Sequence, residues 1–270
     1  MAKNVLIRPL AREQYDKFMA RGRVLFFSAP CGCGKSTLAR ALLSGCQVLS
    51  LHAGEPGFAL PADDEGWEVL LIDDLQQMTE EPDQQALYQL IREYSDRRFV
   101  LLSRGAVPGW LMAFQYAGLM AVLDTNALLW DREDIRTLFH RQGTPVGESV
   151  ITEILRETSG YPLGVAVTAH CMADGRHYSP ELVAQCYHEV FFYFENAVYR
   201  RFDLPIRRFL LELAPFESFD VELARMVSGD PRAGERLGWL QQNTTMLRPA
   251  GVNQFRFWAQ FRTFLLWEMD

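Results

Sequence analysis

The sequence predicts an α/β fold, a parallel sheet with helices on both faces, followed by an all-helical domain and a winged-helix domain. In the first half, short apolar runs alternate with longer helical patterns, as expected of right-handed crossovers between parallel strands. After Trp130, apolar residues recur at helical spacing, and no strand signal interrupts residues 131–172. Near the end of the chain, two short extended segments flank a turn.

The expected strands are short apolar runs, the form that buried parallel strands take. They are residues 24–28, 47–51, 69–72 and 99–102. The longest uncharged run, 105–123, is interrupted by Pro108 and Gly118. We therefore expect it to form a buried helix followed by a strand, and not a membrane span.

The expected helices have apolar residues three and four positions apart. They are residues 35–44, 84–94, 131–139, 148–157, 162–172, 180–202, 206–213, 220–227 and 233–242. Extended pieces at 246–248 and 255–257 flank a turn at 249–253, and helices followed by such a hairpin are typical of a winged helix. We expect three domains, at 1–126, 127–180 and 181–270.

Composition excludes several classes of protein. With 49% hydrophobic and 23% charged residues among 270, the chain is an ordinary globular protein and not a disordered or collagen-like one. Its net charge of −7 disfavours a protein that coats nucleic acid, because phosphate binding needs clustered Lys and Arg. Five cysteines, an odd number, and the lack of a signal-peptide pattern indicate a reducing cytoplasm.

The strongest chemical signal is the segment 28–37, Ser-Ala-Pro-Cys-Gly-Cys-Gly-Lys-Ser-Thr, which lies between an expected strand and an expected helix. This is the context of a Walker A phosphate-binding loop (P-loop), in which backbone amides and the helix dipole hold phosphate anions. Lys35 is expected to reach the outer phosphates, and the Ser36 hydroxyl to bind Mg²⁺. Ala29 replaces a glycine of the pattern, which requires a negative φ there. The alternative is a glycine-rich helix start without a ligand.

Two carboxylates follow the strand 69–72, as in a Walker B segment. Because parallel strands direct their carboxyl ends at the ligand, we expect Asp73 to bind Mg²⁺ through a water and Asp74 to orient an attacking water. Adjacent side chains on a strand face opposite ways, so both reach the site only if the strand ends there. An Asp-Asp turn or helix cap is the alternative. Ser103 or Arg104, at the end of the strand 99–102, is a candidate sensor of the γ-phosphate, unless the arginine is simply solvated.

These segments, in this order, resemble the nucleotide-binding, helical and winged-helix modules of signal-transduction ATPases (STAND class), in the MalT-like branch of LuxR-type transcriptional regulators. Further matching segments are 7–9, 99–104, 131–139, 159–163, 208–211, 226–229 and 255–265. The resemblance implies a P-loop NTPase switch, off with ADP and on with ATP plus an inducer, that self-associates in the ATP state. It implies slow, Mg²⁺-dependent hydrolysis of ATP.

The resemblance also implies roles for particular residues. Asp73 and Asp74 match the metal and water acids, and Arg104 matches the sensor. Pro162 matches a proline that packs near the nucleotide base, and Arg8 with Pro9 matches a motif beside the adenine pocket. The residues of the phosphate loop are Ala29, Pro30, Cys31, Gly32, Cys33, Gly34, Lys35, Ser36 and Thr37.

The sequence departs from the family in three ways. Trp258 stands where relatives have a histidine that touches the ADP β-phosphate, so we expect the ADP state to be weaker or held differently. Only residues 52–68 separate the second strand from Walker B, barely enough for a crossover. The superhelical sensor and the DNA-binding helix-turn-helix of relatives are not found in these 270 residues, so we expect this chain to bind nucleotide and not DNA.

Other residues suggest weaker hypotheses. The loop amides and Lys35 are expected to favour thiolates at Cys31 and Cys33, whose oxidation or alkylation would then block nucleotide binding. A set of histidines and cysteines at 170, 171, 177, 186 and 188 matches no zinc spacing. The aromatic series Tyr187, Phe191, Phe194 and Tyr199 is expected to pack in a core or between domains.

Two other functions compete with the switch. A small-molecule kinase also uses a Gly-Lys-Ser loop, but the expected winged helix supplies neither an arginine-bearing lid nor an acid that binds the acceptor. A non-hydrolysing scaffold with a degenerate site is consistent with Trp258 and with the short crossover.

Overall fold

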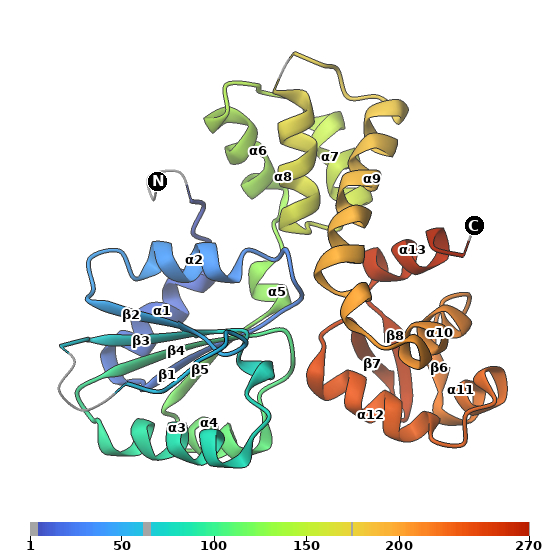
Figure 1. Ribbon diagram of the computed structural model, residues 1–270. Helices are drawn as coiled ribbons and strands as arrows, with labels where there is room; N and C mark the ends of the chain where they lie inside the picture. The colour runs from blue at the N-terminus through green and yellow to red at the C-terminus, as the bar shows by residue number, and fades with distance from the viewer. Residues whose placement is uncertain (1–4, 62–65, 174, 270) are drawn as a thin grey trace. The chain divides into compact units, whose positions relative to one another are not determined.

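The computed structural model divides the chain into two compact units, Met1–Leu129 and Trp130–Asp270 (Figure 1). The structure describes residues 5–61, 66–173 and 175–269. Within those ranges, no helix combines the length and the apolar character needed to cross a membrane.

The first unit is built on a five-stranded parallel sheet in the order β2-β3-β4-β1-β5. The strands are β1 Val24–Ser28, β2 Val48–His52, β3 Val69–Asp73, β4 Arg98–Ser103 and β5 Met120–Asp124. Strand β4 pairs with β1 on one side and with β3 on the other. Since parallel strands share one carboxyl edge, the loop after β1 and the acids after β3 meet on either side of the end of β4.

Helices cover both faces of this sheet, as the sequence predicts (Figure 1). Val24 and Phe26 of β1 belong to a core with side chains of α3 (Glu81–Glu93) and α4 (Met112–Tyr116). The other face carries α1 (Pro9–Arg21) and α2 (Lys35–Leu42), with α5 (Thr125–Leu128) after β5. Short 3₁₀ turns are η2 Leu75–Gln77 and η3 Gly109–Leu111. The run 105–123 thus forms a helix followed by a strand, which confirms the prediction.

Two features of this unit differ from the expectation or extend it. Helix α1 was not predicted, because only Ala11, Tyr15 and Phe18 of its residues are buried and the apolar pattern is sparse. The short connection from β2 to β3 includes no helix within residues 53–61 and 66–68, and residues 62–65 of it lie outside the described part of the chain. The parallel pairing of β2 with β3 is nevertheless complete from Val48 to His52.

The second unit is mainly helical and ends in a three-stranded antiparallel sheet of order β6-β8-β7. Its helices are α6 Arg132–Arg141, α7 Glu148–Thr158, α8 Pro162–Met172, α9 Pro180–Ala197, α10 Leu204–Leu213, α11 Val221–Ser228, α12 Ala233–Asn243 and α13 Ala259–Trp267, with a 3₁₀ turn η4 at Tyr199–Arg201. Its strands are β6 Phe219–Asp220, β7 Leu247–Gly251 and β8 Gln254–Phe257. This is the expected helical segment followed by a winged helix, although β6 and α13 were not predicted.

Helix and strand ends in this unit follow local chemistry. Asp131, Ser179, Asp203 and Asp220 each accept a hydrogen bond from a backbone N–H in the first turn of the helix that follows. Helix α9 ends before Val198, whose φ of −131° and ψ of −64° leave the helical region, so the expected helix 180–202 is too long. The expected turn 249–253 is also too long, because β7 continues to Gly251.

An aromatic cluster centred on Phe194 of α9 holds the helical segment and the winged helix together. The Phe194 ring stacks on Tyr161 at 5.8 Å and meets the Trp258 ring edge-on at 6.0 Å. Tyr161 precedes α8 and Trp258 precedes α13. Phe191, Phe194 and Tyr199 are buried, which confirms the predicted core packing for these three, while Tyr187 is half-buried beside Phe191.

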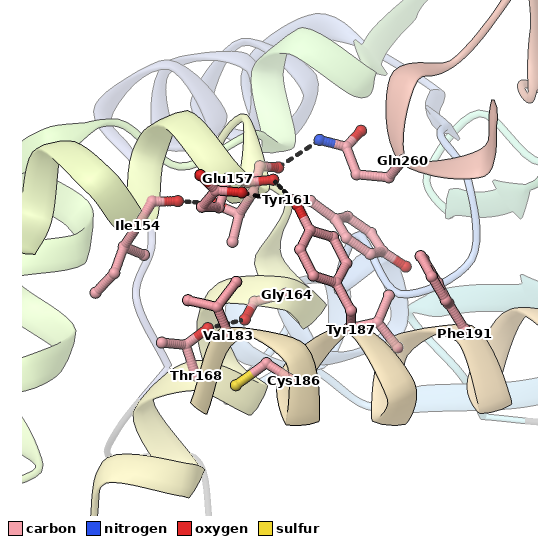
Figure 2. Close-up of a pocket in the computed structure, with 12 residues that line it drawn as sticks. Ile154, Glu157, Tyr161, Gly164, Thr168, Val183, Cys186, Tyr187, Phe191 and Gln260 are labelled. Carbon is pink, nitrogen blue, oxygen red and sulfur yellow. Dashed lines mark hydrogen bonds between the residues drawn. The ribbon is translucent and has the colours of Figure 1, made fainter. Parts of the chain in front are cut away.

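A small cavity of about 40 Å³ lies beside this cluster, among α7, α8, α9 and α13 (Figure 2). Its lining is mostly apolar, and Gln260 closes one side by donating from Nε2 to the Thr158 carbonyl over 2.6 Å. A cavity of this volume has room for about three water molecules. It is therefore far too small to be the nucleotide site.

We expect Gly160→Ala to destabilise the second unit severely. Gly160 has a φ of +74°, and a Cβ there would lie 2.1 Å from the Trp130 carbonyl oxygen. Gly143 is the matched control, because its φ is also +74° but a Cβ would meet nothing within 4 Å. Urea unfolding should show a loss of about 1–2 kcal/mol for Gly143→Ala and clearly more for Gly160→Ala. Equal losses would contradict the steric account.

Candidate functional site

The phosphate loop connects the end of β1 to the start of α2, as the motif requires. Gly32 and Gly34 have φ values of +71° and +78°, while Cys33 between them has a negative φ. This alternation turns successive backbone N–H groups toward one side, and α2 adds the positive end of its dipole. The loop therefore has the geometry of an anion cradle at the carboxyl edge of the sheet.

Ala29 fits the loop where the motif usually has glycine. It is not among the described residues with positive φ, so its methyl group meets the condition set by the sequence. Its backbone N–H donates to the Ser103 carbonyl over 3.3 Å, and its side chain is fully buried. The start of the loop thus continues the pairing of β1 with β4.

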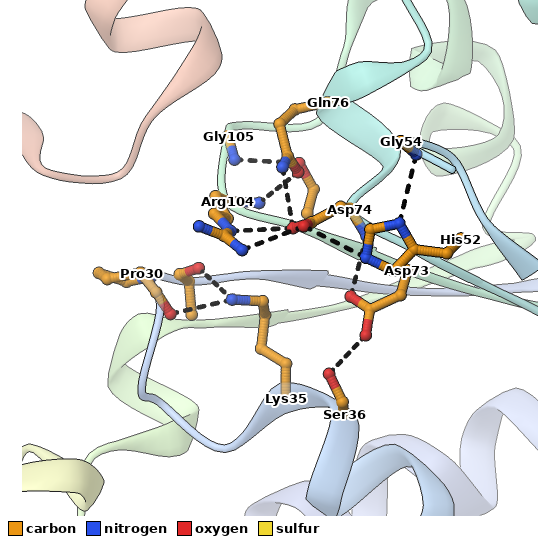
Figure 3. Close-up of polar contacts among 12 residues, drawn as sticks. Pro30, Lys35, Ser36, His52, Gly54, Asp73, Asp74, Gln76, Arg104 and Gly105 are labelled. Atoms are coloured by element: carbon orange, nitrogen blue, oxygen red, sulfur yellow. Dashed lines mark hydrogen bonds and ion pairs between the residues drawn. The ribbon is translucent and has the colours of Figure 1, made fainter. Parts of the chain in front are cut away.

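Lys35 is buried at the start of α2, with 7% of its surface exposed. Its Nζ donates to the carbonyl oxygens of Ala29 and Pro30 over 2.7 and 2.9 Å (Figure 3). Burial lowers the pKa of this ammonium group below its ordinary value. An anion bound in the loop would stabilise that charge, so the buried lysine favours phosphate binding.

Ser36 and Asp73 join the first turn of α2 to the end of β3. The Ser36 hydroxyl donates to Asp73 Oδ2 over 2.6 Å (Figure 3). Hydroxyl and carboxylate oxygens are the ligands that Mg²⁺ prefers, and a divalent ion at this pair would also face the phosphate loop. The donor set therefore fits magnesium. Thr37, the next residue of the motif, is exposed on α2.

Asp74 leaves the strand and turns toward β4. Strand β3 ends at Asp73, and Asp74 has the left-handed conformation, with a φ of 52°. Both acids therefore lie at the carboxyl edge, as the sequence argument required. Arg104 donates two hydrogen bonds to the Asp74 carboxylate, from Nε to Oδ1 over 2.8 Å and from Nη2 to Oδ2 over 3.0 Å.

The electrostatics of Asp74 follow from this pair. Burial alone would raise the pKa of the carboxyl group, but hydrogen bonds from Gln76 and Arg104 and the arginine charge outweigh burial and hold the pKa below its ordinary value. Asp74 is therefore an ionised group in a buried position. Arg104 comes from the end of β4, between the two motif strands, where a sensor of the outer phosphate would lie.

Gln76 is a member of the site that sequence reasoning missed. Its Nε2 donates to Asp74 Oδ1 and its Oε1 accepts from the Arg104 backbone N–H, both over 2.9 Å. It thus ties the residues after β3 to the end of β4. The only signal in the sequence is its position two residues after the acids. Ser103, the other candidate sensor, is buried. Its hydroxyl accepts a hydrogen bond from the Gly105 N–H over 2.9 Å and thereby stabilises the turn after β4.

The remaining expected site residues lie in two places. Arg8 precedes α1 and donates from Nη1 to the carbonyls of Asn126 and Ala127, over 3.2 and 3.3 Å. Because β5 pairs with β1, this places Arg8 and Pro9 near the edge that carries the phosphate loop. Pro162 belongs to the second unit, where it is buried as the first residue of α8.

The hypothesis of reactive thiolates in the loop is wrong for Cys31. Both Cys31 and Cys33 are only 3% exposed. Burial raises the pKa of the Cys31 thiol to about 11, and the nearby Arg104 and Lys35 charges lower it too little to compensate. At neutral pH this residue is a protonated thiol that fills space under the loop.

The histidine and cysteine set at 170–188 gathers no metal site: within the ranges that the structure describes, no three His, Cys, Asp or Glu side chains are placed to hold an ion. Cys171 and Cys186 are buried on α8 and α9, and Cys171 Sγ donates to Glu189 Oε1 over 3.6 Å. Burial raises the pKa of Cys171 to about 12. The pair is therefore part of the helical core.

Trp258, in the place of the family histidine, is 5% exposed and packs edge-on against Tyr161 at 4.6 Å. Its backbone N–H donates to the Met246 carbonyl over 2.7 Å. The indole is thus an element of the aromatic core of the second unit. Packing accounts for the burial of this residue.

Comparison with known proteins agrees with the fold and with the winged helix. Residues 194–270 match the model of the MalT winged helix domain. No curated protein matches the chain in sequence. Among solved structures, a Walker-type ATPase of Pyrococcus abyssi aligns with 98% of this chain and 100% of its own, with a TM-score of 0.70 and 14% identity.

A second solved structure, a STAND protein with a tetratricopeptide repeat sensor from Pyrococcus horikoshii, aligns with 97% of this chain and 42% of its own, with a TM-score of 0.46 and 14% identity. At 14% identity, the Pyrococcus abyssi structure shows a shared fold and no more. The match at residues 194–270 supports the resemblance in the winged helix, and the rest of the chain shares the fold of a Walker-type ATPase.

Proposed function

We propose that this chain is a nucleotide-controlled switch. It binds ATP or ADP with Mg²⁺, hydrolyses ATP slowly, and couples the nucleotide state to domain arrangement and self-association, as part of a MalT-like, LuxR-type regulator in the cytoplasm. The observation that carries the proposal is the 2.6 Å hydrogen bond between Ser36 and Asp73, because it joins the two nucleotide motifs at the mouth of the anion cradle. The buried Lys35 supports it.

Each residue of the site has a role in this proposal. The loop amides and Lys35 bind the phosphates, and Ser36 with Asp73 holds Mg²⁺, which would neutralise phosphate charge. Asp74 orients the attacking water, and Arg104 senses the outer phosphate. Arg8, Pro9 and Pro162 contribute to the pocket of the base.

The domain arrangement is part of the proposal. Residues 1–126 would act as the nucleotide-binding domain, and the second unit as a helical module (127–180) and a winged-helix module (181–270). The cluster of Phe194, Tyr161 and Trp258 links these two modules by packing. Since Trp258 carries no charge, we propose that another group contacts the β-phosphate of ADP.

Lys35→Ala should abolish nucleotide binding, that is, weaken it by at least about 100-fold, because it removes the buried cation of the loop. Isothermal titration calorimetry with ADP and ATP measures the effect. Arg40→Ala is the matched control, since Arg40 is an exposed cation on the same helix, and it should bind normally. A Lys35→Ala variant with wild-type affinity would overturn the site assignment.

Asp74→Asn should still bind ATP but release phosphate at least about 100-fold more slowly, because an amide orients and activates water poorly. Phosphate release under single-turnover conditions measures this, with Asp83→Asn, an exposed position on α3, as the control for the lost charge. Unchanged hydrolysis would remove Asp74 from its role. Transfer of phosphate to a metabolite, without release of free phosphate, would favour a kinase.

A further inference from the structure

The carboxylate of Asp74 accepts hydrogen bonds from two neighbouring side chains. Oδ1 accepts from Gln76 Nε2 and Arg104 Nε, and Oδ2 accepts from Arg104 Nη2. A carboxylate offers about four lone-pair directions, so three of them are taken. A water that Asp74 is to orient needs the one that remains.

His52 faces that remaining position from the end of β2. Its Nε2 lies 3.5 Å from Asp74 Oδ2 (Figure 3). Its Nδ1 accepts from the Gly54 backbone N–H over 3.3 Å, so in the neutral ring the proton is on Nε2, directed at the carboxylate. The His52 side chain is 38% exposed and that of Asp74 only 7%, which places the imidazole on the outer side of the acid.

The three neighbours of Asp74 differ in how firmly they are fixed. Arg104 is held by two hydrogen bonds to the carboxylate, and Gln76 is bonded at both ends of its amide. His52 makes one longer contact, and its side chain is more exposed than that of Arg104, at 38% against 23%. It is therefore the group that can leave most easily.

We infer that His52 is a positioning residue that covers the outer oxygen of Asp74 and restrains the acid from orienting water. This inference rests on the proposed function and names the side chain that keeps hydrolysis slow. The edge strand β2 supplies no residue to either nucleotide motif, but through His52 it would control the acid of the second motif.

The test compares His52→Ala with two other variants of the full chain. His52→Gln keeps an N–H donor and should behave like the wild type, and Ser50→Ala is the control for a change at an exposed position of the same strand. The first measurement is made without nucleotide. A carbodiimide and an amine label exposed carboxylates, and peptide mass spectrometry gives the labelling rate of Asp74, which should rise only in His52→Ala.

The second measurement is phosphate release at saturating ATP together with the affinity for ATP. His52→Ala should raise the rate about tenfold, because Asp74 would then have an uncovered oxygen for the attacking water, and leave the affinity unchanged. Unchanged labelling of Asp74, or faster labelling without a faster rate in a variant that binds ATP, would overturn the inference. If no variant binds ATP, the proposed function fails, and the labelling rate alone decides whether His52 covers Asp74.

Discussion

The hydrogen bond between Ser36 and Asp73 is the contact on which the site depends. It joins residues 37 positions apart, and it forms only because β1 and β3 are parallel and flank β4. Gly34, in the left-handed conformation, directs the chain from the loop into α2 and presents Ser36 to the acid. The apolar runs of the sheet thus position a polar contact that local sequence alone could not form.

A second layer of contacts fixes Asp74. Its left-handed backbone costs about 1–2 kcal/mol for a residue with a side chain, and the bidentate pair with Arg104 and the bond from Gln76 offset that cost. In the proposed switch, a γ-phosphate would compete with Asp74 for Arg104. The same arginine would then sense the nucleotide and release part of the Asp74 carboxylate for the attacking water.

The sequence predicted the fold well where one physical signal dominates. Apolar runs that stop at polar residues located β1, β3 and β4 to within a residue or two. Helix α1 was not predicted, because its buried face consists of only Ala11, Tyr15 and Phe18. Gln76 could not be found, because its partner Arg104 is 28 positions away and reaches it only through the sheet. For Cys31, the sequence suggested nearby positive charge, but burial has the larger effect on its pKa.

We expect this chain to retain a nucleotide, because the anion cradle, the buried Lys35 and the oxygen ligands of Ser36 and Asp73 lie at one edge of the sheet. The most direct measurement is mass spectrometry of the purified chain under native conditions, before and after addition of ATP and Mg²⁺. We expect one adenine nucleotide per chain, ADP as purified. A chain that carries no nucleotide and takes up none when ATP and Mg²⁺ are supplied would contradict the central claim.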